Sequence, residues 1–496
     1  MSNLGTALAS GTRASLSQAR ERTRNETPAG IGTPVTLISA AATASAGAGY
    51  SDFVRSTGSF TTDGFFPGQK VTTSGFGTAA NNGTWVVHAV TATNLTVRDT
   101  SDVITDETAA TAQAVEIRME TLRATGRNVN LEKNILESQE VDPDGQETDS
   151  RHGFNQVVGS PGFQLSRADY DDSIEFTMGS AWAEDIGVTS SPNLGVDGSG
   201  RFERPSGGSF IDDGFRPGDI VRTTGFSVTG NNADWRVTAV DTLLLTVVAT
   251  SDGTSTPTSE TLGGSKDIAL PGKRIDVGTD LCTVLIERAF ADIAQYQVFN
   301  GVAYDQWQLT VEPESIINGT FNLLGMSAAA LASSQVGNSN PLGSSGNSPF
   351  AAFDGEIYEG GSRIAVATSL DFTLSRNRSL NPVIGSRFSP DVFEGTAQVA
   401  GNLTAYFENA TLFNKFVNET ESSIWLRFDD PNDSTQFFNI VFPRVKYNGA
   451  TLDPPQEGPI PLEMPFIALK KTGLAIPGGN TINTLMTVQV SNDLDS

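Results

Sequence analysis

The sequence predicts a mainly β protein built from several modules, and three observations support this fold class. Hydrophobic residues make up 38% of the 496 residues, with 50 Gly and 23 Pro, while long apolar runs of helical period are missing. Residues 297–326 alternate apolar and polar side chains around a turn, which is the pattern of a β-hairpin. Two segments also occur twice, and a chain of this length suits about three to four domains of roughly 150 residues each.

Residues 1–34 are expected to form a polar N-terminal arm. The arm carries four arginines, Arg13, Arg20, Arg22 and Arg24, among small polar residues. A basic arm of this kind is usually a solvated terminus. In an assembling protein it could instead dock on an acidic neighbouring subunit.

Residues 35–118 are predicted to form a small inserted β module, module 1. Short β-prone segments at 35–38, 70–73, 84–90 and 95–97 are separated by Gly, Pro and Asn turns. The pattern returns at residues 190–268, module 2, where GSFIDDGFRPGDIVRTTGF repeats GSFTTDGFFPGQKVTTSGF from 150 residues earlier. We expect the module cores to contain Phe60, Trp85, Phe210 and Trp235, in preference to a sugar-binding role for the tryptophans.

Between and after the modules, two segments share one order of elements, a strand followed by a short helix. In the first, strands within 155–166 precede a helix with cap residues among 169–172 and with Ile174 and Met178 on one face. In the second, Val399, Leu403, Ala405 and Phe407 alternate, and Asn409 caps a helix with Leu412, Phe413, Phe416 and Val417 inward. Upstream, Arg127-Asn128 matches Arg376-Asn377. The chain therefore contains half A, at 119–189 and 269–326, and half B, at 360–496.

The hairpin of half A is echoed in half B. Trp307, Leu309 and Val311 alternate with polar residues, and after Pro313, Asn318 and Gly319 the alternation resumes at Phe321 and Leu323. A shift of 143 positions places Val298, Phe299, Val302, Tyr304 and Leu309 on Val441, Phe442, Val445, Tyr447 and Leu452. Residues 327–359, rich in Ser, Gly and Asn, link the halves either as a flexible strap or as a segment along a neighbour.

The formal charge of −25 argues against a polyanion as a bound partner, because phosphate binding needs clustered Lys and Arg. DNA could pass such a surface more easily than bind to it. The simpler interpretation is that acidity keeps an abundant protein soluble. No apolar run approaches the roughly 20 residues of a membrane helix, the N-terminus lacks a signal peptide core, and the single Cys282 cannot form an intrachain disulfide. We expect folding in a cytoplasm.

No motif predicts catalysis, a cofactor or a metal site. His88 and His152 lack ligand partners at metal-binding spacing, and no nucleophile elbow, P-loop or dinucleotide motif is present. Asp142, Asp144 and Glu147 lie in VDPDGQETD, but the closing Glu of a calcium loop is missing, so a polar loop is favoured. A polysaccharide hydrolase would need a pair of catalytic carboxylates, and no sequence motif identifies such a pair.

Three passages resemble the tail tube proteins of long-tailed bacteriophages. They are RERTRNETPAG from Arg20, ILESQEVDPDGQETDSRHGFNQVVGSPGFQLSRADYDDSIEFTMGSAW from Ile135, and LIERAFADIAQYQVFNGVAYDQWQLTVEPESIINGTFNLLGM from Leu285. The resemblance covers the arm and the two halves. The two modules depart from the minimal family pattern as insertions, and Pro459, Pro461 and Pro465 make the second hairpin unequal to the first.

The resemblance implies duplicated sandwich or barrel halves of β-sheet with short flanking helices, in a structural subunit that is not an enzyme. Its rings would stack into a hollow conduit in the virion tail, assembled in the host cytoplasm, with DNA passing without specific binding. A homotrimer with pseudo-sixfold symmetry is the first expectation and a homohexamer the second, with other tail proteins as partners, no membrane and no cofactor. The expected subunit interface or tube wall comprises Trp307, Leu309, Val311, Phe321, Leu452, Met464 and Phe466. An adhesin or tail-fibre-like binding protein is the alternative, with the modules as its active part.

Overall fold

The computed structural model describes residues 13–491, except for 22–23, 25–30, 32–33, 37–41, 45–48, 56, 100–102, 108–112, 141–143, 145, 147–148, 185, 337–340 and 365. Over the described residues the chain is mainly β, with 50% strand and 6% helix, so the predicted fold class is confirmed. The predicted positions Arg22, Ile38, Asp142 and Glu147 lie outside the described residues.

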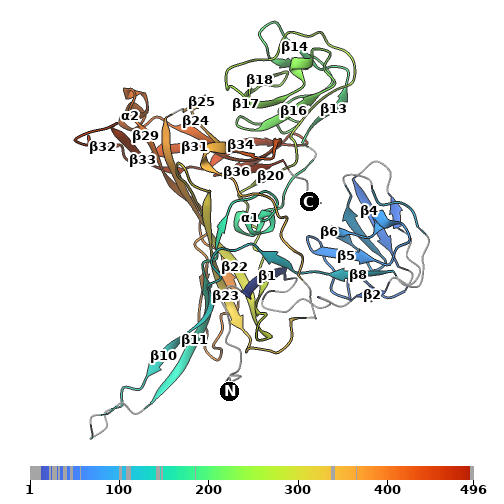
Figure 1. Cartoon of the computed structure of the whole chain (residues 1–496), viewed down its shortest axis with the longest axis vertical. Helices are drawn as coiled ribbons and strands as arrows, with labels where there is room; N and C mark the ends of the chain where they lie inside the picture. The colour runs from blue at the N-terminus through green and yellow to red at the C-terminus, as the bar shows by residue number, and fades with distance from the viewer. Residues whose placement is uncertain are drawn as a thin grey trace, which may run out of the picture.

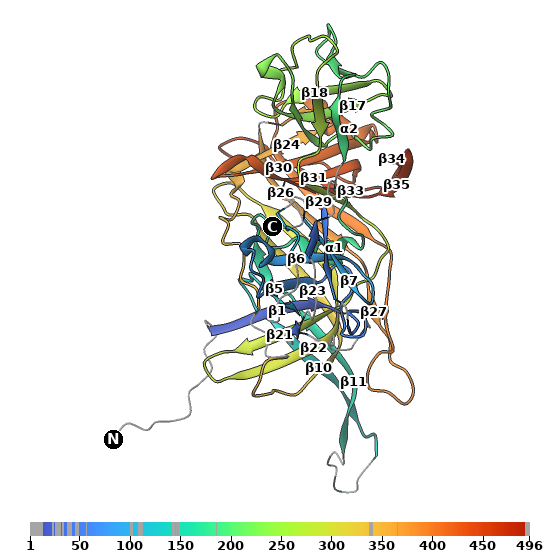
Figure 2. The same cartoon turned by 90° about the vertical axis from the view of Figure 1, so that its right-hand side faces the viewer.

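The molecule consists of a long central body with two smaller β units attached to it. Figure 1 shows one unit at the top of the body and the other at its side, and a hairpin that projects from the opposite end. Figure 2, turned by 90°, shows the same hairpin extending well beyond the rest of the body. The arrangement leaves one end of the body covered and the other end extended.

The strands of half A and the N-terminal arm form one end of the body. They are β1 (Ala14–Arg20), β9 (Glu120–Leu122), β10 (Val129–Glu137), β11 (Ser150–Gly159), β12 (Gly162–Gln164), β20 (Lys273–Asp276), β21 (Val284–Phe290), β22 (Gln295–Val311) and β23 (Asn318–Ala328). The predicted hairpin at 297–326 is confirmed as β22 and β23, which pair antiparallel. Asn318 and Gly319 were predicted in the turn but begin β23, since the turn closes within 312–317.

The strands of half B continue the body. They are β24 (Gly355–Glu359), β25 (Ser362–Arg363), β26 (Ala367–Ser375), β27 (Ser379–Leu380), β28 (Val392–Phe393), β29 (Gln398–Tyr406), β30 (Ser422–Asp430), β31 (Asp433–Tyr447), β32 (Thr451–Leu452), β33 (Pro461–Ala468), β34 (Lys471–Ile476), β35 (Asn480–Thr484) and β36 (Thr487–Val490). β36 pairs with β31 of half B and with β20, so the end of the chain joins the two halves.

Each smaller β unit contains a seven-stranded sheet, with equivalent strand order in the two. The first contains β2 (Val35–Thr36), β3 (Ala42–Ala44), β4 (Tyr50–Val54), β5 (Lys70–Ser74), β6 (Thr84–Val90), β7 (Asn94–Arg98) and β8 (Ala114–Ile117). The second contains β13 (Gly187–Ser191), β14 (Gly195–Val196), β15 (Phe202–Glu203), β16 (Ile220–Thr224), β17 (Asp234–Val240), β18 (Leu244–Ala249) and β19 (Lys266–Ala269). The two sheets also share a β-bulge. It lies between Val87 and Ala89 where β6 pairs with β7, and between Val237 and Ala239 where β17 pairs with β18.

Two α-helices flank the body, at the predicted places. In α1 (Asp171–Met178), Ile174 and Met178 are fully buried, but the N-cap residue is Tyr170 and no side chain caps it. The cap prediction was therefore wrong, and acidic side chains in the first turn favour the helix N-terminus through the helix dipole instead. In α2 (Ala410–Val417), the side chain of Asn409 accepts a hydrogen bond from the backbone N–H of Thr411, as predicted.

The described parts of the N-terminal arm and of the linker pack on the body, although their composition predicts solvated segments. β1 lies in the arm, between β21 and β9, with Leu16 fully buried. The linker was predicted to be a flexible strap or to lie along a neighbour, but its described part lies along its own chain. Leu342 bridges to Glu120 and Ala351 bridges to Ile316, so the linker packs on the surface of the body.

The two described α-helices contain eight residues each, and none of the described helical segments reaches the length that a bilayer requires.

Candidate assembly site

The two halves are joined by direct strand pairing. The end of β22 pairs antiparallel with β26, from Gln306 opposite Ser375 to Val311 opposite Leu370. β26 pairs with β29, and β29 pairs with β33. The strands β23, β22, β26, β29 and β33 therefore form one sheet that runs from half A into half B.

One face of this sheet is apolar and fills the interior of the chain. Trp307 packs against Phe372 with ring centroids 5.3 Å apart, edge to face, a geometry that stabilises aromatic pairs. The residues expected at a subunit interface or tube wall lie on this face. All but one are buried in a single apolar core, and Leu452 is half-buried against it: Trp307, Leu309, Val311, Phe321, Met464, Phe466 and Leu452. Their side chains therefore stabilise the subunit itself, while their strands form the sheet.

The other face of the sheet is polar and outward. It carries amides, hydroxyls and carboxylates beside a few apolar side chains such as Ala400, Pro465 and Ile467. The polar residues include Gln308, Thr310, Asp371, Thr404 and Glu463, of which all but Thr404 are exposed. Cross-strand pairs keep these residues on one face, since Thr310 lies opposite Asp371 and Thr404 opposite Glu463. None of the five strands contains Lys or Arg, so this face carries only negative formal charge.

A pair of arginines reinforces the junction. Arg376 Nη1 donates to the carbonyl oxygens of Met178, at 3.2 Å, and Gly278, at 2.9 Å. Met178 is the last residue of α1, and Gly179 follows in the left-handed conformation with φ 67°. A Cβ at Gly179 would lie 2.9 Å from Arg376 Nη2. A cation at a helix C-terminus is favourable because it opposes the helix dipole, so half B caps the helix of half A.

Arg378 adds a second anchor between the halves. Its Nε donates to Glu394 Oε1 at 2.9 Å, and its Nη1 donates to the carbonyl oxygen of Tyr304 in β22. Burial lowers the pKa of the Arg378 guanidinium, which Glu394 partly counteracts. Close by, Val392 packs with Ala303 and Met326 in a small apolar cluster that spans the two halves.

The halves have equivalent strand pairing. In half A, Glu287 of β21 lies opposite Val298 of β22, and a bulge follows between Val284 and Ile286. In half B, Trp425 of β30 lies opposite Val441 of β31, and a bulge lies between Ser422 and Ile424. Val298 and Val441 are also paired by the sequence repeat. The duplication seen in the sequence thus extends to the hydrogen-bond register.

The equivalence also holds at the hairpins. In half A, Gln308 lies opposite Thr320. In half B, Thr451 of β32 lies opposite Glu463 of β33. Thr451 and Glu463 are the repeat equivalents of Gln308 and Thr320, so β32 corresponds to the end of β22. Within the described chain β22 is paired on both sides here, but β32 pairs only with β33.

The two helices differ in how they are covered. Met178 at the end of α1 is fully buried, whereas Val417 at the end of α2 is 58% exposed. No residue of α2 is buried, although Leu412, Phe413 and Phe416 pack partly against the core. The inward orientation predicted for Val417 was therefore wrong. The end of α2 lacks, within one chain, the cover that half B provides for α1.

The end of the body opposite module 2 carries two projecting elements. The hairpin β10–β11 exposes Ile135 and Leu136 by 61% and 60%, and Figure 2 shows it projecting from the body. The loop between β27 and β28 exposes Ile384 fully. The two elements touch, since the Asn155 backbone N–H donates to the carbonyl oxygen of Arg387 at 2.8 Å.

The two modules contact the body through equivalent positions, but module 2 uses hydrogen bonds to an amide where module 1 uses an ion pair. Ile220 of module 2 exchanges two hydrogen bonds with the side chain of Gln489, at 2.9 and 2.8 Å. Arg236 lies fully buried over the ring of Tyr358, 4.3 Å from its centroid, and burial lowers its pKa to about 10. At the position equivalent to Ile220, module 1 has Lys70, whose Nζ lies 2.9 Å from Glu120 Oε1.

The contact of module 1 encloses a charged cavity of about 260 Å³ beside α1. Arg20 pairs with Glu175 at 2.7 Å. Burial raises the pKa of Glu120 to about 7, although Lys70 opposes this. Burial also opposes ionisation of Asp172, yet Lys70 and Arg20 lower the pKa of its carboxyl below its usual value. Opposite charges therefore lie side by side in the cluster, where Lys70 pairs with Glu120 and Arg20 with Glu175.

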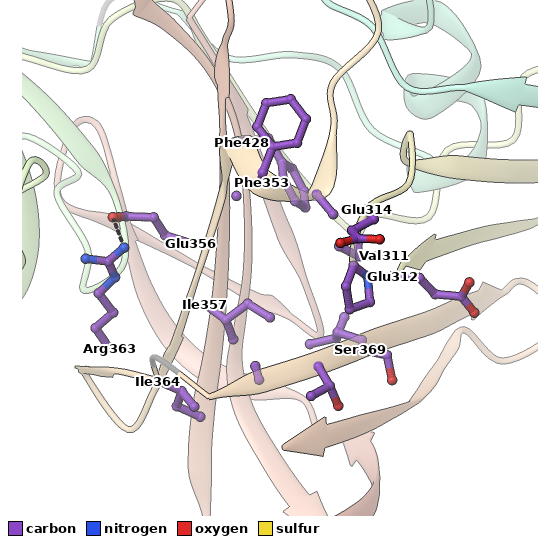
Figure 3. Close-up of a pocket in the computed structure, with 16 residues that line it drawn as sticks. Val311, Glu312, Glu314, Phe353, Glu356, Ile357, Arg363, Ile364, Ser369 and Phe428 are labelled. Atoms are coloured by element: carbon purple, nitrogen blue, oxygen red, sulfur yellow. Dashed lines mark ion pairs between the residues drawn. The ribbon is translucent and has the colours of Figure 1, made fainter. Parts of the chain in front are cut away.

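A second cavity, of about 400 Å³, lies at the end of the β22–β23 hairpin. Figure 3 shows Glu356 paired with Arg363 on one side and Glu312 and Glu314 on the other. The Glu356–Arg363 ion pair measures 3.0 Å, and Phe353 is 81% exposed. The cavity walls combine carboxylates with apolar side chains and offer no nucleophile beside a base.

The aromatic residues predicted for the module cores lie in two separate apolar clusters. Phe60 and Trp85 are buried in one, and Phe210 and Trp235 in the other. Each indole N–H donates to a threonine hydroxyl, from Trp85 to Thr73 at 2.8 Å and from Trp235 to Thr223 at 3.0 Å. Both tryptophans thus bury their polar atom with a partner, as buried tryptophans generally do.

The part of the chain that the structure describes contains no group of three metal-ligating side chains. His88 stacks on Tyr50 with ring centroids 4.2 Å apart, and burial lowers its pKa. Burial raises the pKa of Cys282 to about 11, so its thiol stays protonated near neutral pH.

Sequence reasoning did not assign a role to Arg376, Arg378 or β1. The partners of Arg376 are the backbone carbonyls of Met178 and Gly278, which lie 198 and 98 residues earlier, and no local pattern can indicate contacts at such separations. The signal that could have pointed to the junction is the repeated Arg-Asn pair, Arg127-Asn128 and Arg376-Asn377. Arg376 of the second copy contacts the C-terminal end of α1.

Comparison with known proteins gave one family. A family model described as phage tail tube protein matches residues 11–468. A search of curated proteins found no match to the chain.

Proposed function

Because the chain belongs to the phage tail tube protein family, we propose that it is the subunit of a hollow tail tube, in which stacked rings carry DNA from the virion into the host. A structural role in the phage tail follows from the family, as do assembly with itself and with other tail proteins and a location in the virion tail. The conduit, the ring symmetry and assembly in the host cytoplasm are parts of the proposal.

The observation that carries the proposal is the polar face of the sheet that joins the halves. We assign this face to the lumen, because its five strands contain no Lys or Arg. Basic side chains are what DNA phosphates bind. Exposed Asp371 and Glu463 repel phosphates at a distance, and amides and hydroxyls such as Gln308 and Thr310 offer only weak, exchangeable contacts. Such a wall lets DNA slide.

We infer ring closure from two edges of this sheet, at Thr125 beside β12 and at β32, which pairs only with β33 in the described chain. An exposed strand edge favours pairing with another chain, and a ring removes such edges. Since each chain contributes two similar halves, three chains give six similar units around the lumen. We therefore favour a homotrimer with pseudo-sixfold symmetry, with the homohexamer as the second choice.

Stacking of rings is the role we assign to the projecting hairpin β10–β11. It extends along the direction opposite module 2 (Figure 1), and its exposed Ile135 and Leu136 would be buried by a neighbouring ring. In the proposed division of the chain, module 2 at 190–268 interrupts half A, and module 1 at 35–118 lies between the N-terminal arm and half A. We place both modules on the outside of the tube, where insertions are best tolerated.

Imaging of the purified full-length chain by negative-stain electron microscopy tests the proposal. Long hollow tubes with stacked rings are the expected result. Discrete oligomers that do not polymerise, and that bind glycans through the modules, would instead favour the adhesin. Nothing in the described residues suggests a reaction, so no catalytic role is proposed.

A further inference from the structure

We propose that half B of one chain binds half A of a second copy through the same contacts that join half A to half B within the chain. This inference rests on the proposed tube function and assigns the residues of the contact between subunits. The junction inside the chain has two parts, the pairing of β22 with β26 and the docking of Arg376 on α1. Each part has an equivalent pair of surfaces that one chain leaves apart.

The first part is a strand pairing with a definite register. Inside the chain, Gln308 lies opposite Thr373. The equivalent of Gln308 in half B is Thr451, because both occupy the same position opposite the second strand of the hairpin. The equivalent of Thr373 in half A is Ala124, since each lies three residues before the repeated Arg-Asn pair. Thr451 should therefore lie opposite Ala124 of the partner subunit.

The two surfaces lie at opposite ends of the shared sheet. At one end, Thr451 is exposed and Leu452 is half-buried, and within the described chain β32 pairs only with β33. At the other end, the Thr125 backbone N–H donates to the carbonyl oxygen of Gly162 at 2.7 Å, which places Thr125 beside β12 at the end of the sheet. One end can thus add to the other in a second copy, which leaves neither edge open.

The second part is the cap on a helix. Arg376 donates to the carbonyl oxygen of Met178, the last residue of α1. The equivalent of Arg376 is Arg127, and the last residue of the eight-residue α2 is Val417. Arg127 of the partner subunit should therefore donate to the carbonyl oxygen of Val417. This contact would also cover Val417, which is 58% exposed, whereas the equivalent residue of α1, Met178, is fully buried.

A second copy is the occupant because the chain already contains a copy of the docking partner. Within the chain, half B contacts half A through the β22–β26 strand pairing and through the Arg376 cap on α1. Half A has the same backbone pairing between its strands as half B has. A different protein would need to reproduce both features. The contact is heterologous, so repetition closes a ring rather than a twofold dimer.

Engineered disulfides test the register. In a full-length chain with Cys282→Ser, the pair Thr451→Cys and Ala124→Cys should give covalent oligomers on oxidation, because opposed strand residues lie within disulfide reach. The matched control Gln308→Cys with Thr373→Cys should close within one chain. The control Thr451→Cys with Thr121→Cys is three residues out of register, about 10 Å, and should not link chains.

The outcomes are distinguishable on a non-reducing gel of assembled protein. A ladder from the Thr451–Ala124 pair alone supports the inference. Tubes that form without this ladder, while the Gln308–Thr373 pair closes, overturn the inference and leave the tube function standing. Failure of the unmodified chain to form any ring or tube overturns both.

Substitution of the arginine provides a second readout. Arg127→Ala should lower ring and tube yield at least tenfold when equal amounts of folded, unassembled chain, quantified by circular dichroism, are compared. Arg201→Ala is the control and should assemble normally, because Arg201 is a half-buried arginine of module 2 whose ion-pair partner, Asp197, lies in the same module. Arg127→Lys should restore assembly in part, since Lys keeps the charge and loses the fork geometry. Normal assembly of Arg127→Ala would contradict the helix cap.

Discussion

Reversing the charge of the proposed lumen should slow the passage of DNA. The perturbation is the double substitution Asp371→Lys and Glu463→Lys, on exposed positions of the polar sheet face. Neither side chain contributes to the apolar core, so folding and assembly should persist. The double variant places two cations per chain on a face whose strands contain none.

The size of the effect follows from screened electrostatics. Two unit charges about 10 Å apart in water interact by about 0.4 kcal/mol, and physiological salt reduces this to roughly 0.1 kcal/mol. Reversal turns repulsion into attraction and so doubles the change. DNA carries a charge about every 1.7 Å, so each site faces several phosphates at once, and two sites change the energy by roughly 1–2 kcal/mol per chain.

The assay is the rate of DNA ejection from phage that carry the variant subunit. A change of about 1.4 kcal/mol corresponds to tenfold in an equilibrium constant, and a tube repeats the change in every ring, so ejection should slow at least tenfold. Added salt should relieve the effect. The amide variant, Asp371→Asn with Glu463→Gln, removes the negative charges without adding cations that attract DNA phosphates, so it should slow ejection far less than the lysine variant does. Wild-type ejection by the lysine variant, in normally assembled tails, would refute the assignment of this face to the lumen.

Three further predictions concern stability, pH and stacking. Trp307→Ala should lower the free energy of unfolding by about 3–5 kcal/mol, because it leaves a cavity at the fully buried centre of the sheet. The control Ile384→Ser, on the exposed loop, should change the free energy of unfolding by less than about 0.5 kcal/mol. Equal effects of the two substitutions in denaturant titration would contradict the packing. Burial raises the pKa of Glu120 from 4.5 to about 7, so the folded chain holds a proton that the unfolded chain releases, and stability should fall as pH rises from about 4.5 to 7, by at most about 3 kcal/mol from this group. Glu120→Gln should flatten that slope in thermal melts, and an unchanged slope would exclude Glu120 as its source. Ile135→Ser with Leu136→Ser should leave rings intact but shorten or abolish tubes in electron micrographs, and full-length tubes would exclude the hairpin tip from stacking.

The sequence was sufficient for the fold class, the hairpin at 297–326 and the family, because each depends on local periodicity or on repetition. Alternation of Trp307, Leu309 and Val311 identified a strand with one apolar face. The same local rules missed β1, since Ala14–Arg20 contains small and polar residues that resemble a loop. Ser17 and Gln18 are nevertheless buried, because strands lie on both sides of β1.

The assembly site was predictable only in outline. The residues predicted at the interface are apolar, and they fill the core of one chain, since a strand of a sheet presents its apolar face inward and its polar face outward. The polar partners that join the halves, Arg376 and Arg378, bind backbone carbonyls far away in the sequence. The linker likewise has a polar composition, yet Phe350 is fully buried. Such contacts depend on tertiary structure that no local pattern encodes.

The central claim is that two halves of one chain stand as neighbouring units around a lumen. The most direct measurement is the symmetry of the tube, obtained by electron microscopy of the assembled protein with chains resolved within a ring. The account predicts three chains per ring and six similar, unequal units, with the β22–β26 junction alternating with an equivalent junction between chains. Six chains in a ring with strict sixfold symmetry, or units joined by other surfaces, would contradict it.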